Sequence, residues 1–154
     1  MLYLTIKWLH ILSSTVLFGT GIGTAFFMLM AQRSGDVRAI AWATRTVVLA
    51  DWLFTTPAVI FQPLSGLALA RLAPYPMTAP WLIAALVLYV GVGACWAPVV
   101  GLQLRMRRLA ARAAAEGGEL PALYHRCFRL WFVLGCLAFP AVIAIFWLMA
   151  ATPG

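Results

Sequence analysis

The sequence predicts an all-α membrane protein built as a bundle of four antiparallel transmembrane helices. Of its 154 residues, 64% are hydrophobic and only 10% are charged, whereas a soluble domain carries about 25% charged residues. The apolar residues form four long runs, each sufficient to cross a hydrocarbon core of ~30 Å. Because these runs take up most of the chain, we expect one integral membrane domain over residues 1–154.

The basic residues predict how the bundle is oriented. Of eleven Lys and Arg residues, only Lys7 and Arg71 lie outside the two segments that join the first run to the second and the third to the fourth. Positive charge beside membrane spans stays cytoplasmic, so both termini are expected outside, in an up-down bundle of a bacterial inner membrane. Topology then accounts for the net charge of +7, and we expect the lipid bilayer as partner and no nucleic acid.

Sequence signals predict where the first span ends and where the second span bends. The first is expected over residues 2–31, as an uncleaved helix because its apolar run exceeds the ~7–15 residues of a signal peptide, and a polar turn at 32–36 ends it. The second is expected over 40–72 and contains Pro57 and Pro63. Prolines are tolerated in a membrane helix where neighbours satisfy the freed carbonyls, which predicts a kink facing the bundle.

The last two spans are joined by a basic segment. After a proline-rich link, the third span is expected over residues 81–104 and continues as a basic helix to Ala115 within the loop 105–121, which contains Gly117 and Gly118. The fourth span is expected over 122–150, after Pro121. The basic helix can lie against anionic headgroups, either as a topology signal or as a site for lipids or a partner.

Polar residues inside the spans are costly, so their spacing is informative. In the first span His10 lies on a helical stripe of polar and small residues, and Gln62 and Tyr89 lie on similar stripes of the second and third spans. Since sequential spans are antiparallel neighbours, matching residues by their distance from each loop puts His10, Gln62 and Tyr89 at one level, as a polar layer in the outer half.

Asp51 is expected deeper in the bundle, opposite residues 19–21. A carboxylate at mid-span costs roughly 2.5–3.5 kcal/mol, so we expect it to be protonated, hydrogen-bonded to Thr55, or paired with Arg45. It serves either as a structural link between helices or as a proton site. Gly19 and Gly23 form a GxxxG pattern, which predicts close helix packing that brings the second span near the first.

His10 is the only histidine within a span and the candidate ligand of a cofactor. Imidazole is a usual ligand of b-type haem, and Lys7 and Arg71 at the outer rim could pair with its propionates. The alternative is a structural histidine hydrogen-bonded to Gln62 or Tyr89. His125 is expected at the opposite membrane face, so a haem would be five-coordinate, use a methionine, or lie between two copies of the chain.

Several segments resemble a bacterial family of small predicted integral membrane proteins classed as a domain of unknown function. They are residues 7–11 (KWLHI), 19–23 (GTGIG), 51–57 (DWLFTTP), 62–66 (QPLSG), 129–132 (RLWF) and 145–149 (IFWLM). The resemblance implies four spans and an inner-membrane location. A wider likeness, carried by Lys7 and His10, is to HemJ, the haem-containing protoporphyrinogen oxidase, and to the copper-resistance domain CopD; it implies that His10 ligates haem or a metal.

Three functions are therefore expected as alternatives, and whether the protein is an enzyme stays open. The first is a b-type haem-binding membrane protein with a redox role, in which His10 is the axial ligand. The second is a non-catalytic assembly or partner subunit, as a homo-oligomer or in a larger membrane complex. The third is a small transporter with Asp51 on a polar path.

Overall fold

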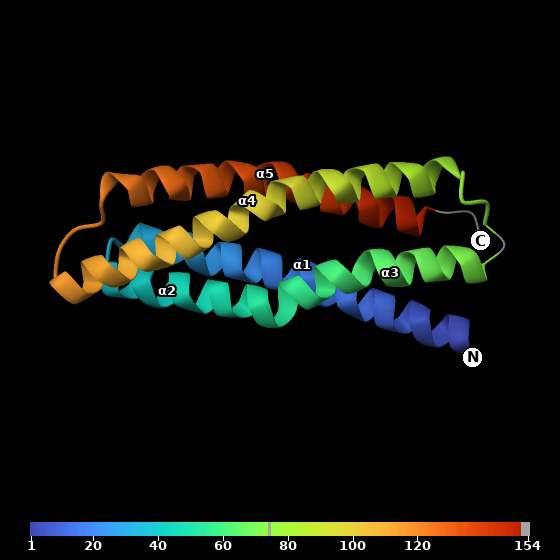
Figure 1. The fold of residues 1–154 in the computed structure, drawn as a ribbon, viewed down its shortest axis with the longest axis horizontal. Helices are drawn as coiled ribbons and strands as arrows, with labels where there is room; N and C mark the ends of the chain where they lie inside the picture. The colour runs from blue at the N-terminus through green and yellow to red at the C-terminus, as the bar shows by residue number, and fades with distance from the viewer. Residues whose placement is uncertain (74, 152–154) are drawn as a thin grey trace.

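The fold consists of four long helices with short connections, described by a computed structural model for residues 1–73 and 75–151. The elements are α1 (Leu2–Ser34), α2 (Val37–Ala50), a π-helix η1 (Asp51–Thr55), α3 (Thr56–Leu72), α4 (Pro80–Glu116) and α5 (Ala122–Ala150). The segments α2, η1 and α3 form one span, so four helices are long and apolar enough to cross a membrane. Figure 1 shows that both termini lie at the same end of the bundle. The predicted fold class is confirmed.

Local chemistry sets where the helices end. Gly35 follows α1 with a φ of 69°, and Gly117 follows α4 with a φ of 66°; this left-handed backbone suits glycine because a Cβ would be strained there. The carboxylate of Asp36 then caps α2 by accepting a hydrogen bond of 2.9 Å from the Arg38 N–H. These caps extend α1 and α2 slightly beyond the bounds expected from hydropathy alone.

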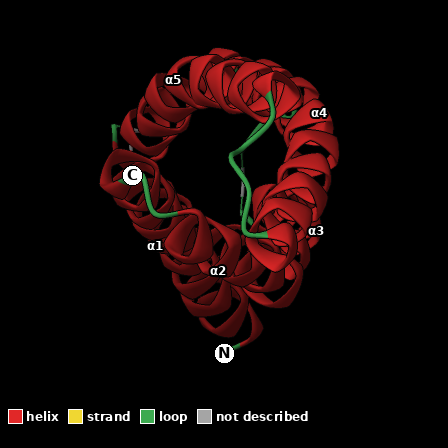
Figure 2. Ribbon diagram, turned by 90° about the vertical axis from the view of Figure 1, so that its left-hand side faces the viewer, coloured by secondary structure: helices red, strands yellow, loops and turns green. Residues whose placement is uncertain are grey.

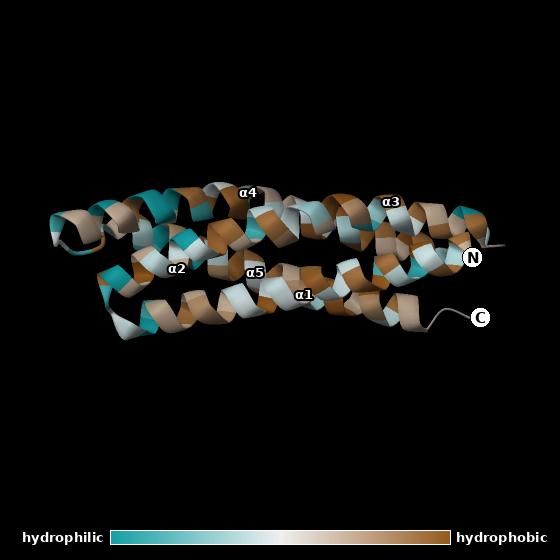
Figure 3. Cartoon of the chain, turned by 90° about the horizontal axis from the view of Figure 1, so that it is seen from below, coloured by the Kyte–Doolittle hydropathy of each residue, from teal (hydrophilic) through white to brown (hydrophobic). Residues whose placement is uncertain are grey.

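The best-packed part of the bundle lies at the end that contains the two basic connections, which we call the basic end. Its core joins all four spans through Met28, Ile40, Ala43, Val47, Met106, Ala110, Tyr124, Cys127 and Trp131. All nine arginines near this end are exposed, and hydrophilic residues gather there in Figure 3. The basic end is therefore an apolar core inside a charged rim.

The second span is interrupted in the middle, where the sequence predicts a kink. Its backbone widens into η1, in which the Thr56 N–H bonds the Asp51 carbonyl, and Figure 1 shows the bend between α2 and α3. Pro63 has no N–H for the carbonyl of Val59, four residues earlier. The Tyr89 hydroxyl of α4 donates a hydrogen bond to that carbonyl. A neighbouring helix thus satisfies the group that the proline leaves unpaired, as the bilayer requires.

The four spans pack unevenly around the bundle. The extensive helix–helix contacts are those of α4 with α5, of α2 with α4, and of α1 with both α2 and α3. In the described residues, the backbones of α1 and α5, and those of α3 and α4, come close at few points. Seen end-on, the helices are arranged as a ring (Figure 2). The Phe18 ring of α1 bridges to Phe139 and Phe146 of α5, with centroid distances of 5.0 and 5.3 Å. The α1–α3 pair and the α4–α5 pair therefore separate towards the termini.

The glycine pattern of the first span does not pack as predicted. A Cβ added at Gly19 or Gly23 would meet no atom within 4 Å, whereas one at Gly66 would meet the Cε1 of His10 at 3.4 Å. Gly66 thus lies where α3 contacts α1, and the prediction that Gly19 and Gly23 bring these spans together is wrong. Gly19 is exposed and Gly23 is half-buried.

Replacing Tyr89 by Phe tests whether its hydroxyl compensates for Pro63. We expect Tyr89→Phe to lower the free energy of unfolding by about 1 kcal/mol, the size of an interhelical hydrogen bond in a membrane. In a Pro63→Ala background the new N–H of residue 63 can bond the Val59 carbonyl. Tyr89→Phe should then lower the free energy of unfolding by less than in the wild type. Denaturation in detergent micelles measures both values, and an equal loss in the two backgrounds would contradict the pairing.

Candidate functional site

The separation of the helix pairs leaves a large apolar pocket inside the bundle. Its volume is about 500 Å³, and all four spans line it, from Ser14 to Leu29, Asp51 to Gln62, Tyr89 to Gln103, and Trp131 to Phe146. A pocket of this size is in the range that holds a drug-sized ligand or a cofactor, and such sites are typically apolar with a few polar groups. This pocket has that character, with polar side chains around Asp51 and at Gln62 and Tyr89.

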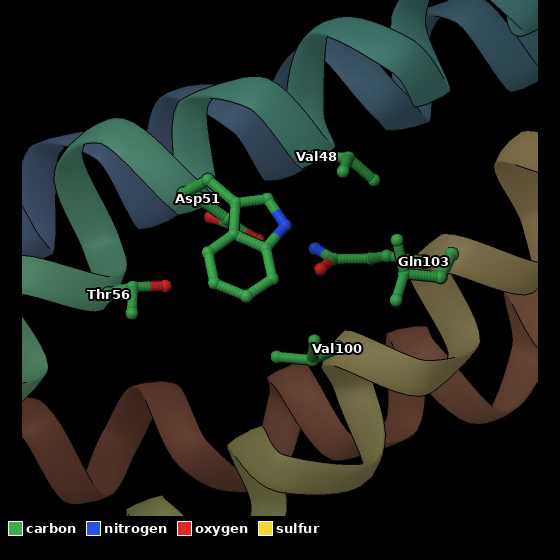
Figure 4. A pocket seen from close by; sticks show the side chains of 7 residues that line it. Val48, Asp51, Thr56, Val100 and Gln103 are labelled. Atoms are coloured by element: carbon green, nitrogen blue, oxygen red, sulfur yellow. The ribbon is translucent and has the colours of Figure 1, made fainter.

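The inner polar group is built on η1, near mid-span. The Thr55 hydroxyl donates a hydrogen bond of 2.8 Å to the Asp51 Oδ1, and both side chains are buried. The Gln103 side chain extends from α4 towards the same carboxyl (Figure 4). The hydrogen bond to Thr55 agrees with the sequence prediction. Asp51 forms no ion pair with Arg45 in the described part of the chain, because the arginine side chain is exposed.

The outer polar group joins α1 to α3 around His10. The His10 Nδ1 lies 2.7 Å from the Ser65 Oγ, and the Gln62 Nε2 donates a hydrogen bond of 2.9 Å to the backbone oxygen of His10. The imidazole packs against Gly66, where an added Cβ would lie 3.4 Å from the His10 Cε1, at the limit of ordinary van der Waals contact. Three residues from one face of α3 thus fix both the backbone and the ring of His10.

The hydroxyl of Ser65 determines which nitrogen of His10 carries the proton. Ser65 donates its one proton to the Phe61 carbonyl at 2.7 Å, one helical turn earlier. The Ser65 oxygen also lies 2.7 Å from the His10 Nδ1. Because a carbonyl oxygen can only accept, we infer that the serine proton goes to Phe61, that Nδ1 donates to the serine oxygen, and that Nε2 keeps a free lone pair. A histidine oriented in this way, with the outer nitrogen free and the other bonded to a protein acceptor, is the usual arrangement of a histidine ligand.

The predicted site residues are brought together only in part. His10 and Gln62 are in contact, but the imidazole bonds Ser65 rather than Gln62 or Tyr89, and the Tyr89 hydroxyl bonds the Val59 backbone. Gln62 and Tyr89 line the pocket, whereas His10 lies one helical turn beyond Ser14, at its outer end. Lys7 is exposed, with its Nζ 5.9 Å from the centre of the Tyr3 ring, and Arg71 is exposed at the end of α3.

Two residues of the site were missed by sequence reasoning. Ser65 lies three residues after Gln62, so it shares the α3 face that points at α1, and this spacing could have identified it. Gln103 lies in the third span, and its side chain approaches Asp51 at the π-helix η1. An extra residue in that turn rotates Asp51 relative to a regular helix, and no sequence periodicity reports such a rotation.

The tautomer of His10 can be tested directly. In nitrogen NMR spectra of histidine-labelled protein, we expect the wild type to show the Nδ1-protonated form of His10, identified by its loss in His10→Asn. Ser65→Ala removes the acceptor and should produce a mixture of tautomers. The resonances of His125, which is exposed, serve as the internal control. A His10 spectrum that is unchanged by Ser65→Ala would show that Ser65 does not set the tautomer.

The fold and the pocket can now be set beside known proteins. A family model described as "Predicted integral membrane protein (DUF2269)" matches residues 4–153. Searches among curated proteins and among solved structures found no match. The family description agrees with four helices that are long and apolar enough to span a membrane, and such helices contact lipid. The chain therefore belongs to the DUF2269 family of predicted integral membrane proteins.

Proposed function

We propose that this membrane protein binds a b-type haem at the outer end of its pocket and has a redox role. The observation that carries the proposal is the imidazole of His10, whose Nδ1 is held by Ser65 and whose Nε2 is left free. Haem iron is commonly ligated by a histidine imidazole, and the free Nε2 could serve as that ligand. The adjoining pocket of about 500 Å³ supplies apolar walls from all four spans.

The outer rim suits the carboxylates of such a cofactor. Lys7 lies one helical turn from His10 towards the N-terminus, and Arg71 ends the helix that contains Ser65. Both side chains are exposed and face water or headgroups, where a propionate could reach them. Gln62 and Tyr89 would contact the cofactor from the pocket wall, with their hydrogen bonds to the backbone unchanged. Bound haem would supply one-electron chemistry, and the chain would supply the ligand and the apolar surroundings.

The proposed setting is a bacterial inner membrane with the basic end in the cytoplasm. The nine exposed arginines at that end support it, because positive residues near spans remain on the cytoplasmic side. Both termini, His10 and the two rim cations then face the outside. A redox partner would reach the cofactor from that side or from within the bilayer.

A second candidate function is that of a partner subunit. It is favoured by the open space over Gly19 and Gly23 on an exposed face of α1, where a helix of another chain could approach closely. Transport is less well supported, because the pocket that reaches Asp51 has predominantly apolar walls and offers an ion little to replace its hydration shell.

Substituting His10 tests the haem proposal. Wild-type protein expressed with ample haem should show a Soret band, and His10→Ala should lose it. Ser65→Ala should weaken haem binding by roughly 10–100-fold, as expected when the residue that orients a ligand is removed. His125→Ala, at the other end of the bundle, is the matched control and should keep its haem. A His10→Ala protein with full haem content would disprove the assignment.

Filling the pocket tests whether the ligand occupies it. Gly93 lines the pocket, whereas Gly91 on the same helix is exposed, and neither has an atom within 4 Å of an added Cβ. We expect Gly93→Phe to reduce haem content and Gly91→Phe to leave it unchanged. Equal haem content in the two variants would place the ligand outside the pocket.

A further inference from the structure

Two cavities of different character meet at Asp51 and Gln103. A small cavity of about 10 Å³ is lined by Val48, Asp51, Trp52, Thr56, Val100, Gln103 and Leu104. Asp51 and Gln103 also line the large pocket. Figure 4 shows the two side chains facing each other from η1 and α4. Together they form a partition between the small cavity and the pocket.

The small cavity has the size and chemistry for one water molecule. A volume of ~10–15 Å³ admits one water, which needs two to four polar partners. The Asp51 carboxyl, the Thr56 hydroxyl and the Gln103 amide line the cavity and can supply them. The remaining walls are aliphatic except for the Trp52 ring, so the polar groups are confined to the side that borders the partition.

On the pocket side, the hydroxyls are already paired, whereas the Asp51 carboxyl, the Gln103 amide and the buried, unpaired indole N–H of Trp96 remain available in the described part of the chain. The hydroxyls of Ser14 and Thr24 donate to backbone oxygens one turn earlier. The Tyr89 hydroxyl and the Gln62 amide nitrogen are likewise bonded to the backbone. Thr55 donates to one oxygen of the Asp51 carboxyl, and the side chain of Gln103 is also hydrogen-bonded to the carboxyl.

No cation balances the carboxyl at this position. Neither cavity is lined by Lys, Arg or His among the described residues, and the other ionisable groups on their walls are Tyr89, Cys95 and Cys136. The helices that pack against η1 are α1, α2 and α3. Their Lys and Arg residues are all exposed, as is Arg105 of α4, and the imidazole of His10 is hydrogen-bonded to Ser65. An unpaired carboxylate in such a place is costly, and uptake of a proton removes the charge.

We propose that Asp51 is a proton-exchange site between the water of the small cavity and the molecule bound in the large pocket. The O–H bond of the protonated carboxyl breaks as the proton passes to an oxygen or nitrogen of that molecule. A hydronium ion at the cavity position then returns a proton to the carboxylate and leaves water. Gln103 and Thr55 are positioning residues that hold the carboxyl between the two. The inference rests on the proposed function in requiring an occupant of the pocket.

Infrared spectroscopy of the purified protein in lipid nanodiscs, without added ligand, tests the site. The other three acidic residues are Asp36, Glu116 and Glu119, all exposed. We therefore expect one protonated-carboxyl band from the membrane interior, absent in Asp51→Asn and displaced in Asp51→Glu. In heavy water this band should shift rapidly as the proton exchanges. The second variant covers the case in which Asp51→Asn does not fold.

A cavity-filling variant separates exchange through the small cavity from exchange by other routes. Val100→Leu adds volume to the wall of the small cavity and should abolish the rapid shift. Val87→Leu, on an exposed position of the same helix, should leave it unchanged. Absence of the band in wild type, or equally rapid exchange in Val100→Leu, would overturn the proposal. Because His10→Ala should abolish haem binding and leave the band intact, failure of either proposal is distinguishable from failure of the other.

Discussion

The requirement that every backbone carbonyl inside a bilayer find a partner shapes the middle of this protein. Pro63 leaves the Val59 carbonyl without its helical partner, and Tyr89 of α4 reaches across to bond it. The same span widens at η1, just before Pro57, and there the polar side chain of Asp51 turns inwards. The hydrogen bond from Tyr89 holds α3 and α4 together where their packing is otherwise sparse, so the pocket remains bounded on that side.

The two halves of the bundle are built differently. At the basic end, side chains of all four spans interlock around Tyr124 and Met106, neither of which is exposed. Towards the termini, the buried core is smaller and consists of Ala70, Ala79 and Leu82. The pocket lies between the helices and reaches Trp131 of the larger core. Membrane proteins commonly place such sites between helices that do not pack fully.

Hydropathy and charge predicted the four helices well. The free-energy cost of exposing charges and unpaired backbone groups to lipid is large, and it applies to every span. They also placed His10 and Gln62 at one level, since antiparallel neighbours with short loops keep their register. They could not identify Ser65 as the partner of His10, which depends on side-chain geometry across two helices. Packing at Gly19 and Gly23 was wrongly predicted because the GxxxG pattern shows only that close approach is possible. The pairing of Asp51 with Gln103 lies at the π-helix, whose extra residue changes the direction in which side chains of the second span point, and hydropathy does not report this change.

We propose one mechanism that would connect the outer histidine, the apolar pocket and the inner carboxyl: a cofactor held at His10, with proton exchange at Asp51. Its central claim is that the protein carries a non-covalent haem b. Native mass spectrometry of protein purified from the membrane in mild detergent tests this most directly. The account predicts a species heavier than the chain by the mass of one haem b, or one haem per two chains if it lies between copies. Only bare chain and lipid adducts, from cells with ample haem, would contradict it.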